Sequence, residues 1–148
     1  MSLPAYLLDL NVILDYLQNR PPHAQDAEDL FVAAKSSKVA LWVSGDAFST
    51  LFYVLEREFR QQKRPNSSAL AQSKIQGLLK RVSVAPVTKA VLDTAIAYGL
   101  DDFEDAIQAV AAVEAGVTTL VTRDARGYDD FPPNTLAVLT PAQALALL

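Results

Sequence analysis

The feature that most constrains the fold of this chain is the alternation of short apolar segments with longer amphipathic ones. The short segments are rich in Val and Leu, and they lie at residues 5–9, 39–43, 82–87, 118–122 and 136–140. They lack a regular polar face, which is typical of parallel strands that are buried on both sides. We therefore predict an α/β fold, a three-layer α/β/α sandwich around a central, mainly parallel sheet of four to five strands, in a single domain spanning residues 1–148.

The segments between these strands carry apolar residues at helical spacing. The predicted helices cover 11–17, 24–36, 46–62, a start at Ser67 or Ser68 to 79, 88–98, 102–115 and a terminal helix that begins at Pro141. Ser44 is the expected N-cap of the third helix, and Thr88 is the expected N-cap of the fifth. Gly99 and Gly116 are expected to end the two helices that precede them.

The composition limits the classes of function. The hydrophobic content of 51% and charged content of 20% are those of a globular protein, and the absence of cysteine excludes disulfides and thiolate metal sites. The N-terminus does not resemble a secretion signal, and no apolar run reaches the roughly 18 residues that span a bilayer, so we expect a cytoplasmic protein without a membrane partner. The net charge of −4 argues against binding nucleic acid by bulk electrostatics, so any such contact must be local.

Three acids occupy positions that a parallel sheet could bring together. Asp9 ends the first strand, Asp124 follows the fourth, and Asp105 lies in the first turn of the helix that leads to that strand. Ligands of open parallel sheets bind beyond the carboxyl ends of the strands. Clustered carboxylates repel one another, and a hard cation such as Mg²⁺ or Mn²⁺ removes that cost. The pattern is typical of a metal site that acts on phosphodiesters.

Each of these residues also has a purely structural interpretation. Asp9 and Asn11 fit a turn in which Asn11 caps the following helix. Asp102 and Asp105 have the spacing of an N-cap and an acid that the helix dipole favours, and for Asp102 we prefer the cap. Asp124 fits the start of a turn. Taken one at a time, the acids do not decide the function.

The order of several motifs resembles the PIN-domain nucleases, many of which are VapC-like toxins. The motifs are DLNVILDYL (9–17), SGDAFSTLFYVLER (44–57), DFEDAIQAVAAVEAG (102–116) and TLVTRDARGYDDF (119–131), and the similarity extends over nearly the whole chain. The resemblance implies a Mg²⁺- or Mn²⁺-dependent endoribonuclease with an RNA substrate, an antitoxin partner and a homodimeric state.

The resemblance also assigns roles to residues. It implies that Asp9, Asp105 and Asp124 hold the metal, and we add Asp102 as a further candidate ligand. Asn11 matches the polar residue that orients the site, and Thr122 matches the hydroxyl that precedes the last acid. The implied catalytic set is therefore Asp9, Asn11, Asp105, Thr122 and Asp124.

One position departs from the family pattern. The pattern has a glutamate on the helix after the second strand, and this chain has Thr50 there. Asp46, one turn earlier, could in principle substitute, although its direction on the helix differs by well over a quarter turn. Glu56 lies almost two turns later, too far along the helix to be an equivalent replacement. The segment Phe52–Leu55 resembles a branch of PIN-like proteins with Asn or Thr at this point. The alternative is therefore a weak or inactive PIN-like protein that binds RNA or a protein partner.

The basic residues allow two interpretations. They gather on the helices between 46 and 81, as Arg57, Arg60, Lys63, Arg64, Lys74, Lys80 and Arg81. Such a run is commonly the solvated face of helices, and it could also contact RNA phosphates. The same helices are where a dimer mate or an antitoxin would bind, by the resemblance. A phosphatase with Asp9 as nucleophile fits less well, because such enzymes usually have a second aspartate where Asn11 stands.

Overall fold

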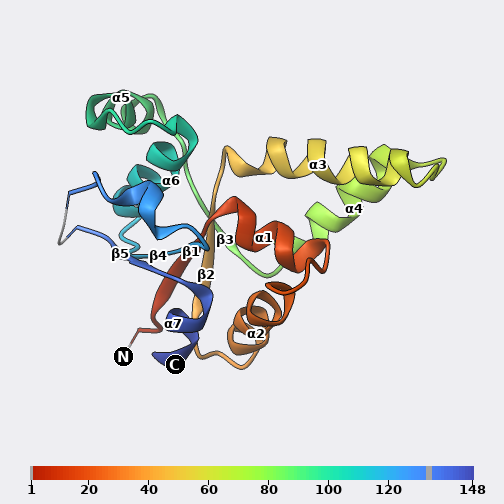
Figure 1. Cartoon of the computed structure of the whole chain (residues 1–148), viewed down its shortest axis with the longest axis horizontal. Helices are drawn as coiled ribbons and strands as arrows, with labels where there is room; N and C mark the ends of the chain where they lie inside the picture. Colours follow the sequence, from red (N-terminus) through yellow and green to blue (C-terminus); the bar gives the residue numbers. More distant parts are fainter. Residues whose placement is uncertain (1, 133–134) are drawn as a thin grey trace.

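The computed structural model describes residues 2–132 and 135–148 and has a five-stranded sheet at its centre (Figure 1). The strands are β1 (Ala5–Leu8), β2 (Ala40–Ser44), β3 (Ser83–Ala85), β4 (Thr119–Val121) and β5 (Ala137–Leu139). Their order is β3-β2-β1-β4-β5, and every neighbouring pair is parallel. The predicted parallel sheet is confirmed, with β1 in its middle.

Seven helices connect and cover the strands. They are α1 (Leu10–Leu17), α2 (Ala24–Lys35), α3 (Ala47–Gln61), α4 (Ser67–Leu79), α5 (Lys89–Tyr98), α6 (Phe103–Glu114) and α7 (Pro141–Ala146), with a 3₁₀ helix η1 at Ala125–Tyr128. Within residues 2–132 and 135–148, no helix is long and apolar enough to cross a bilayer. The predicted helix positions agree with these bounds to within two residues.

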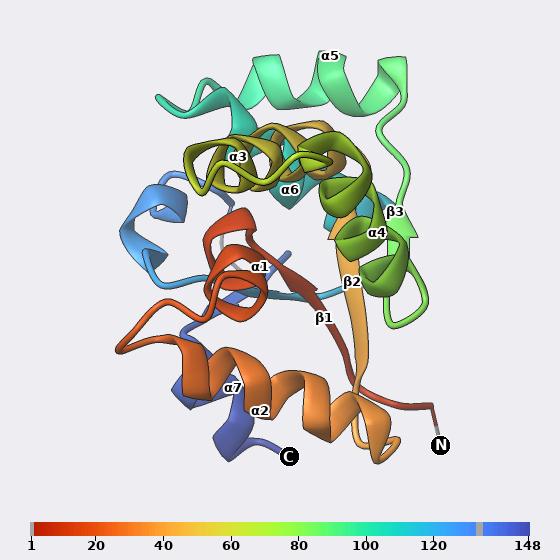
Figure 2. The ribbon, with the colours of Figure 1, turned by 90° about the vertical axis from the view of Figure 1, so that its right-hand side faces the viewer.

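The two faces of the sheet are covered by different helices, and the strands explain why. Successive side chains of a strand point to opposite faces. Tyr6 and Leu8 of β1 pack in one core with α1, α2 and α7, whereas Leu7 packs in a second core with α5 and α6. Figure 2 shows α5 and α6 on one side of the sheet and α2 and α7 on the other. The predicted α/β/α sandwich is confirmed.

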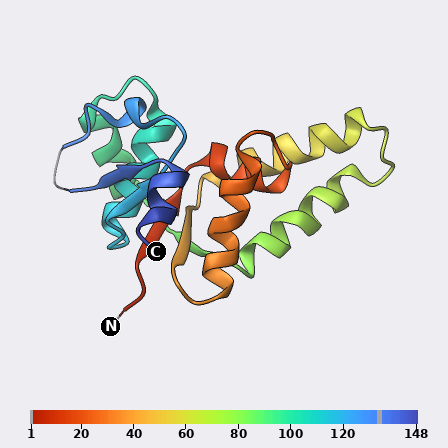
Figure 3. The same cartoon turned by 60° about the horizontal axis from the view of Figure 1, so that its bottom comes forward.

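Helices α3 and α4 form a hairpin that projects from the sandwich (Figure 3). Leu55, Phe59 and Ala71 make a small core of their own between the two helices. On this hairpin the exposed large apolar side chains are those of Tyr53 and Leu79. Dimerisation through residues 46–79 would need an exposed apolar face on these helices. In the described part of the hairpin, that face is limited to these two side chains.

The helix N-termini test the predicted caps. Thr88 Oγ1 accepts a hydrogen bond from the Val91 amide, and Gly99 has a φ of 64°, so both predictions for α5 are confirmed. Ser44 is not the cap of α3, because it pairs with Ala85 in the sheet and the chain stays extended to that point. Asp46 takes the cap position instead, without a side-chain hydrogen bond.

The start of α4 also differs slightly from the prediction. Asn66 holds the N-cap position, and Ser67 is the first residue of the helix. Ser67 and Ser68 were the expected caps, and both fall inside the first turn. The Asn66 side chain makes no capping hydrogen bond to α4.

Candidate functional site

Asp9 lies at the carboxyl end of the central strand. β1 ends at Leu8 and α1 begins at Leu10, so Asp9 is the single residue between a strand and a helix. Its amide donates to the Val121 carbonyl at 2.9 Å, which fixes it beside the end of β4. Only 6% of the residue is exposed. The acid in the apolar LLDLNV run is therefore a buried carboxylate at the edge where parallel sheets bind ligands.

Two side chains hold the Asp9 carboxylate. Gln108 Nε2 donates to Oδ1 at 2.9 Å, and Thr122 Oγ1 donates to Oδ2 at 2.6 Å. Both partners are almost fully buried. Thr122 Oγ1 also accepts from the Asp124 amide at 3.1 Å, so one hydroxyl ties the turn after β4 to Asp9. Hydrogen bonds to both oxygens stabilise the ionised form and fix its orientation.

Gln108 was not predicted from the sequence. It lies in α6, and its Oε1 accepts from the Leu10 amide at 3.2 Å while its Nε2 donates to Asp9. The side chain thereby holds both the acid and the first turn of α1. The available signal was an amide in the apolar run AIQAVAAV, one turn after Asp105, because a buried polar side chain needs partners.

Asp105 extends this network. The Tyr128 hydroxyl donates to Asp105 Oδ1 at 3.3 Å. The hydroxyl oxygen of Tyr128 in turn accepts a hydrogen bond from Gln108 Nε2 at 3.4 Å. Gly127 packs so closely on Asp105 that a Cβ there would lie 2.9 Å from Oδ2. Tyr128 was also missed from the sequence, and the only signal was an aromatic residue in the polar segment DARGYDD. Asp9, Gln108, Tyr128 and Asp105 thus form one connected chain of polar groups.

The electrostatics show that negative charge is concentrated here. Burial, followed by the charges of Asp9 and Asp102, raises the pKa of Asp105 to about 7. Burial, followed by the charge of Asp46, raises the pKa of Glu104 above its ordinary value. Burial also raises the pKa of Tyr128, so its hydroxyl keeps its proton and acts as a donor. Glu104 and Asp46 were not among the predicted site residues.

The remaining predicted residues lie around this centre. Asp102 is exposed and caps α6, its Oδ1 accepting from the Asp105 amide at 3.1 Å, which confirms the cap. Asp124 follows β4 as expected, but its side chain is exposed. Asn11 Oδ1 is buried and makes no hydrogen bond to any described group. Thr50 is half-buried on α3.

The donor set suits a hard cation by chemistry. The acids and amides here offer oxygen ligands, and buried Oδ1 atoms of Asn11 and Asp46 lack hydrogen-bond partners among the described residues. Burial, and after it the charges of Asp9 and Asp102, raise the pKa of Asp105, and a cation beside the carboxylate would oppose both effects. In the part of the chain that the structure describes, no three acidic or histidine side chains stand close enough to form a complete metal cluster. The structure links Asp9 and Asp105 through Gln108 and Tyr128, and the chemistry of these two oxygen donors is that of ligands for a hard cation.

The comparisons with known proteins now identify the family. The model of the PIN domain matches residues 5–126, which is most of the chain. The chain belongs to the PIN-domain family. The predicted resemblance is confirmed, and the acids described above lie within the matched region.

Solved structures share the fold of this PIN domain. VapBC2 from Rickettsia felis, bound to a promoter DNA fragment, has a matching chain with 18% identity and a TM-score of 0.64, covering 92% of this chain and 98% of that one. VapC20 from Mycobacterium tuberculosis, a sarcin-ricin loop cleaving toxin, matches with 15% identity and a TM-score of 0.61, covering 84% and 92%. PAE2754 from Pyrobaculum aerophilum matches with 20% identity and a TM-score of 0.62, covering 97% and 88%. A search of curated proteins gave no match.

An ion pair with a buried carboxylate anchors the turn that carries Thr122 and Asp124 in this PIN domain. Arg123 Nε lies 2.7 Å from Asp15 Oδ2, and the Asp15 side chain is 1% exposed. Asp15 belongs to α1, whose first turn follows Asp9. The turn after β4 is therefore fixed to the α1 region at two points, Thr122 to Asp9 and Arg123 to Asp15. Neither Asp15 nor Arg123 was among the residues predicted from the sequence to be functional.

The raised pKa of Asp105 predicts how stability depends on pH in the absence of metal. The folded state keeps the Asp105 proton up to about pH 7, whereas the unfolded chain loses it near its ordinary value of 3.8. The folded state thus binds more protons between about pH 4 and 7, and its stability falls as pH rises through that window. After allowance for solvent screening, we expect the Asp105→Asn variant to be more stable than wild type at pH 8 by about 1–2 kcal/mol.

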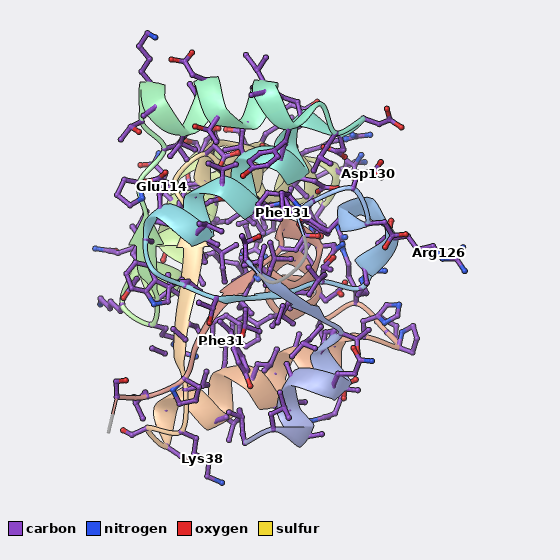
Figure 4. The ribbon with its side chains drawn as sticks, turned by 90° about the vertical axis from the view of Figure 1, so that its left-hand side faces the viewer. Phe31, Lys38, Glu114, Arg126, Asp130 and Phe131 are labelled. Carbon is purple, nitrogen blue, oxygen red and sulfur yellow. The ribbon has the colours of Figure 1, made fainter. Side chains whose placement is uncertain are left out.

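Thermal unfolding in EDTA at pH 4.5 and pH 8 would measure this difference. The gain of Asp105→Asn over wild type should be present at pH 8 and absent or small at pH 4.5, because the wild-type carboxyl group is protonated in the acidic sample. Asp130→Asn is the matched control, since it removes an exposed carboxylate after η1 (Figure 4). An equal difference at the two pH values would contradict the assignment of the proton to Asp105.

Proposed function

We propose that this PIN domain is a divalent-metal-dependent endoribonuclease that hydrolyses RNA phosphodiesters, and that it is the toxin of a toxin–antitoxin pair. The observation that carries the proposal is the meeting of Asp9 and Asp105 at the carboxyl end of the central strand, linked by Gln108 and Tyr128. Membership of the PIN-domain family supports it. The shared fold with VapC20, described as a sarcin-ricin loop cleaving toxin, supports RNA as the substrate.

In this proposal Asp9 and Asp105 are the principal ligands of a Mg²⁺ or Mn²⁺ ion. Asp124 and Asp102 are further candidates, because both lie in segments whose backbone is fixed to the site. Asn11 completes the set with its buried, unpartnered oxygen. When bound, such a cation stabilises the negative charge that grows on the phosphate under attack and makes water more acidic.

The protein's own groups position these ligands. Gln108 and Thr122 each donate to one oxygen of Asp9, which fixes the carboxylate plane and leaves the remaining lone pairs directed elsewhere. Tyr128 donates to Asp105 and keeps one face of that carboxylate covered. Gly127 allows the 3₁₀ helix to approach Asp105. Thr122 acts as an orienting group in this scheme, since its hydroxyl proton is engaged by Asp9.

Cleavage of a pool of structured RNAs would test the function. Purified wild-type protein and Asp9→Asn, purified identically, would be incubated with RNA in EDTA, Mg²⁺ or Mn²⁺. We expect cleavage by the wild type only, and only with metal. Equal cleavage by both proteins would indicate a contaminating ribonuclease. Absence of cleavage by folded wild type under all conditions would overturn the proposal.

A second candidate is a PIN-like protein that binds RNA or a protein without cutting. Thr50 favours it, because a hydroxyl replaces the carboxylate of the family pattern. Asp46 and Glu104 add negative charge close to the site, and Asp46 has an unpartnered buried oxygen one turn before Thr50. Thr50→Glu separates the two candidates. If the wild type does not cleave RNA and Thr50→Glu does, the result supports the non-cutting protein. If the wild type itself cleaves RNA, the second candidate is excluded.

The partners follow from the same proposal. An antitoxin protein is supported by the structural neighbours, which include VapBC complexes and a toxin-antitoxin complex from Klebsiella pneumoniae that has 17% identity, a TM-score of 0.58 and coverage of 92% of this chain and 97% of that one. We also propose a homodimer. Its apolar contacts would come from α5 and α6, where Ile96, Tyr98 and Phe103 are exposed. Light scattering of Ile96→Asp would test that face.

A further inference from the structure

The exposed side of α3 carries an ordered row of side chains. Thr50, Tyr53, Arg57 and Arg60 recur at intervals of three or four residues, so they share one face of the helix; we call this row the α3 stripe. Leu51, Leu55 and Phe59 occupy the opposite, buried face. Lys63 and Arg64 continue the positive charge at the tip of the hairpin.

The composition of the α3 stripe is unusual for a solvated helix face. The Tyr53 side chain is 64% exposed, although an aromatic ring of this size gains most when it is buried. Arg57 is exposed and makes no ion pair with a described residue. Arg60 pairs with Glu56, but the arginine side chain is 71% exposed, so the pair contributes little and can be exchanged for another anion. An exposed aromatic ring beside solvent-exposed guanidinium groups is the composition of surfaces that bind single-stranded nucleic acid.

The α3 stripe also begins beside the candidate site. Asp46 precedes α3, one turn before Thr50, and its charge acts on Glu104 in the first turn of α6, next to Asp105. Figure 1 shows α3 starting near the beginning of α1 and running out to the hairpin tip. The distance along the helix from Tyr53 to Arg60 is roughly 10 Å. A strand with one phosphodiester at Asp9 and Asp105 can therefore continue outward over α3.

Charge favours RNA over a protein as the occupant. The chain has a net charge of −4, yet Arg57, Arg60, Lys63 and Arg64 lie within eight residues of one hairpin, where the acids are Glu56 and Glu58. Glu56 pairs with Arg60 and Glu58 accepts a hydrogen bond from Gln18, so a net positive charge remains on this part of the hairpin. Polyanionic phosphate complements this local charge, and the acidic site at the other end accepts a phosphodiester only with a cation. The face offers Tyr53 as its one large exposed apolar group, which is too little for a hydrophobic protein interface.

We propose that the α3 stripe binds single-stranded RNA and guides it into the site, with the Tyr53 ring stacked on a base and Arg57 and Arg60 contacting phosphates. This inference rests on the proposed function for the identity of the ligand. It adds the surface of this chain that binds the substrate. Stacking on a base explains why one aromatic ring is exposed on this helix. Every base has a face that can stack, so the α3 stripe imposes little sequence preference.

The test is RNA binding measured without cleavage. Fluorescence anisotropy would follow a labelled single-stranded RNA of 12 nucleotides in EDTA, with the protein in an Asp9→Asn background. Tyr53→Ala should weaken binding about 5- to 10-fold, and Tyr53→Phe should retain it, because the ring and not the hydroxyl stacks. Arg57→Ala should weaken binding and reduce the slope of log K against log salt by about 0.7. A duplex RNA of equal length should bind more weakly than the single strand.

The matched control is Lys38→Ala, which removes one exposed positive charge in the turn between α2 and β2, outside the α3–α4 hairpin (Figure 4). It should bind RNA like its parent. Unchanged affinity in both Tyr53→Ala and Arg57→Ala would overturn the inference. The inference would also be overturned if Tyr53→Ala changed the protein from dimer to monomer and kept its affinity for RNA. That result would identify the α3 stripe as a contact between two copies of the chain.

The experiment separates this inference from the proposed function. Binding in EDTA needs no catalysis, so a protein that binds through the α3 stripe and never cleaves would fail only the nuclease proposal. A protein that cleaves with metal but binds RNA equally well without Tyr53 would fail only the inference drawn here from α3.

Discussion

Asp105→Asn is expected to fold normally and to lose RNA cleavage by a factor on the order of 10²–10³. The substitution keeps the size of the side chain and an oxygen that Tyr128 can reach, so the polar chain to Gln108 survives. It removes the negative charge and, under the proposed function, the main partner of Asp9 in holding a cation. The loss should appear in kcat and should not be recovered by more RNA.

A second measurement for this variant does not depend on activity. At pH 8, added Mg²⁺ or Mn²⁺ should raise the melting temperature of the wild type, because the ion binds the folded state and relieves the repulsion at Asp105. The rise should be small or absent in Asp105→Asn. Asp124→Asn and Asp102→Asn, compared in parallel, would rank the exposed acids as ligands. A full metal-induced rise in Asp105→Asn would exclude Asp105 from the metal site.

Arg123→Ala is expected to destabilise the protein by about 2–3 kcal/mol, which corresponds to a fall in melting temperature of roughly 8 °C. The substitution leaves the Asp15 carboxylate buried without its cation, and an uncompensated buried charge is costly. Because the arginine is one-third exposed, the effect should lie below that of a fully buried pair. Thermal unfolding at pH 7 measures it.

Two variants make this prediction specific. Arg126→Ala is the matched control, since Arg126 extends into solvent from η1, three residues later (Figure 4), and should leave the melting temperature within a degree or two. Adding Asp15→Leu to Arg123→Ala should recover most of the loss, because no charge then remains buried. If the double variant is less stable than Arg123→Ala alone, the cost comes from lost packing and not from the unpaired carboxylate.

The local elements of the fold could be predicted because their causes are local. Short apolar runs without a polar face define β1, β2 and β4 as buried strands, and Thr88 and Gly99 mark the two ends of α5 through their own capping chemistry. The prediction that Ser44 caps α3 was wrong because this residue can either cap a helix or extend a strand. Pairing with Ala85 keeps Ser44 in the sheet. The capping propensity of serine depends on neighbouring residues and carries no information about a contact with a strand 41 residues away.

The site divides along the same line. The sequence by itself determined that Asp9 stands at the end of the first strand, that Asp102 caps α6 and that the family is that of the PIN domain, because each depends on neighbouring residues or on the order of motifs. That this strand is the central one was decided by the sheet topology. Only the tertiary structure decided which groups contact Asp9. Gln108 and Thr122 reach it across about a hundred residues of chain. Hydrogen bonds depend on position to within fractions of an ångström, and that precision arises only when the packed sheet and helices fix every partner at once.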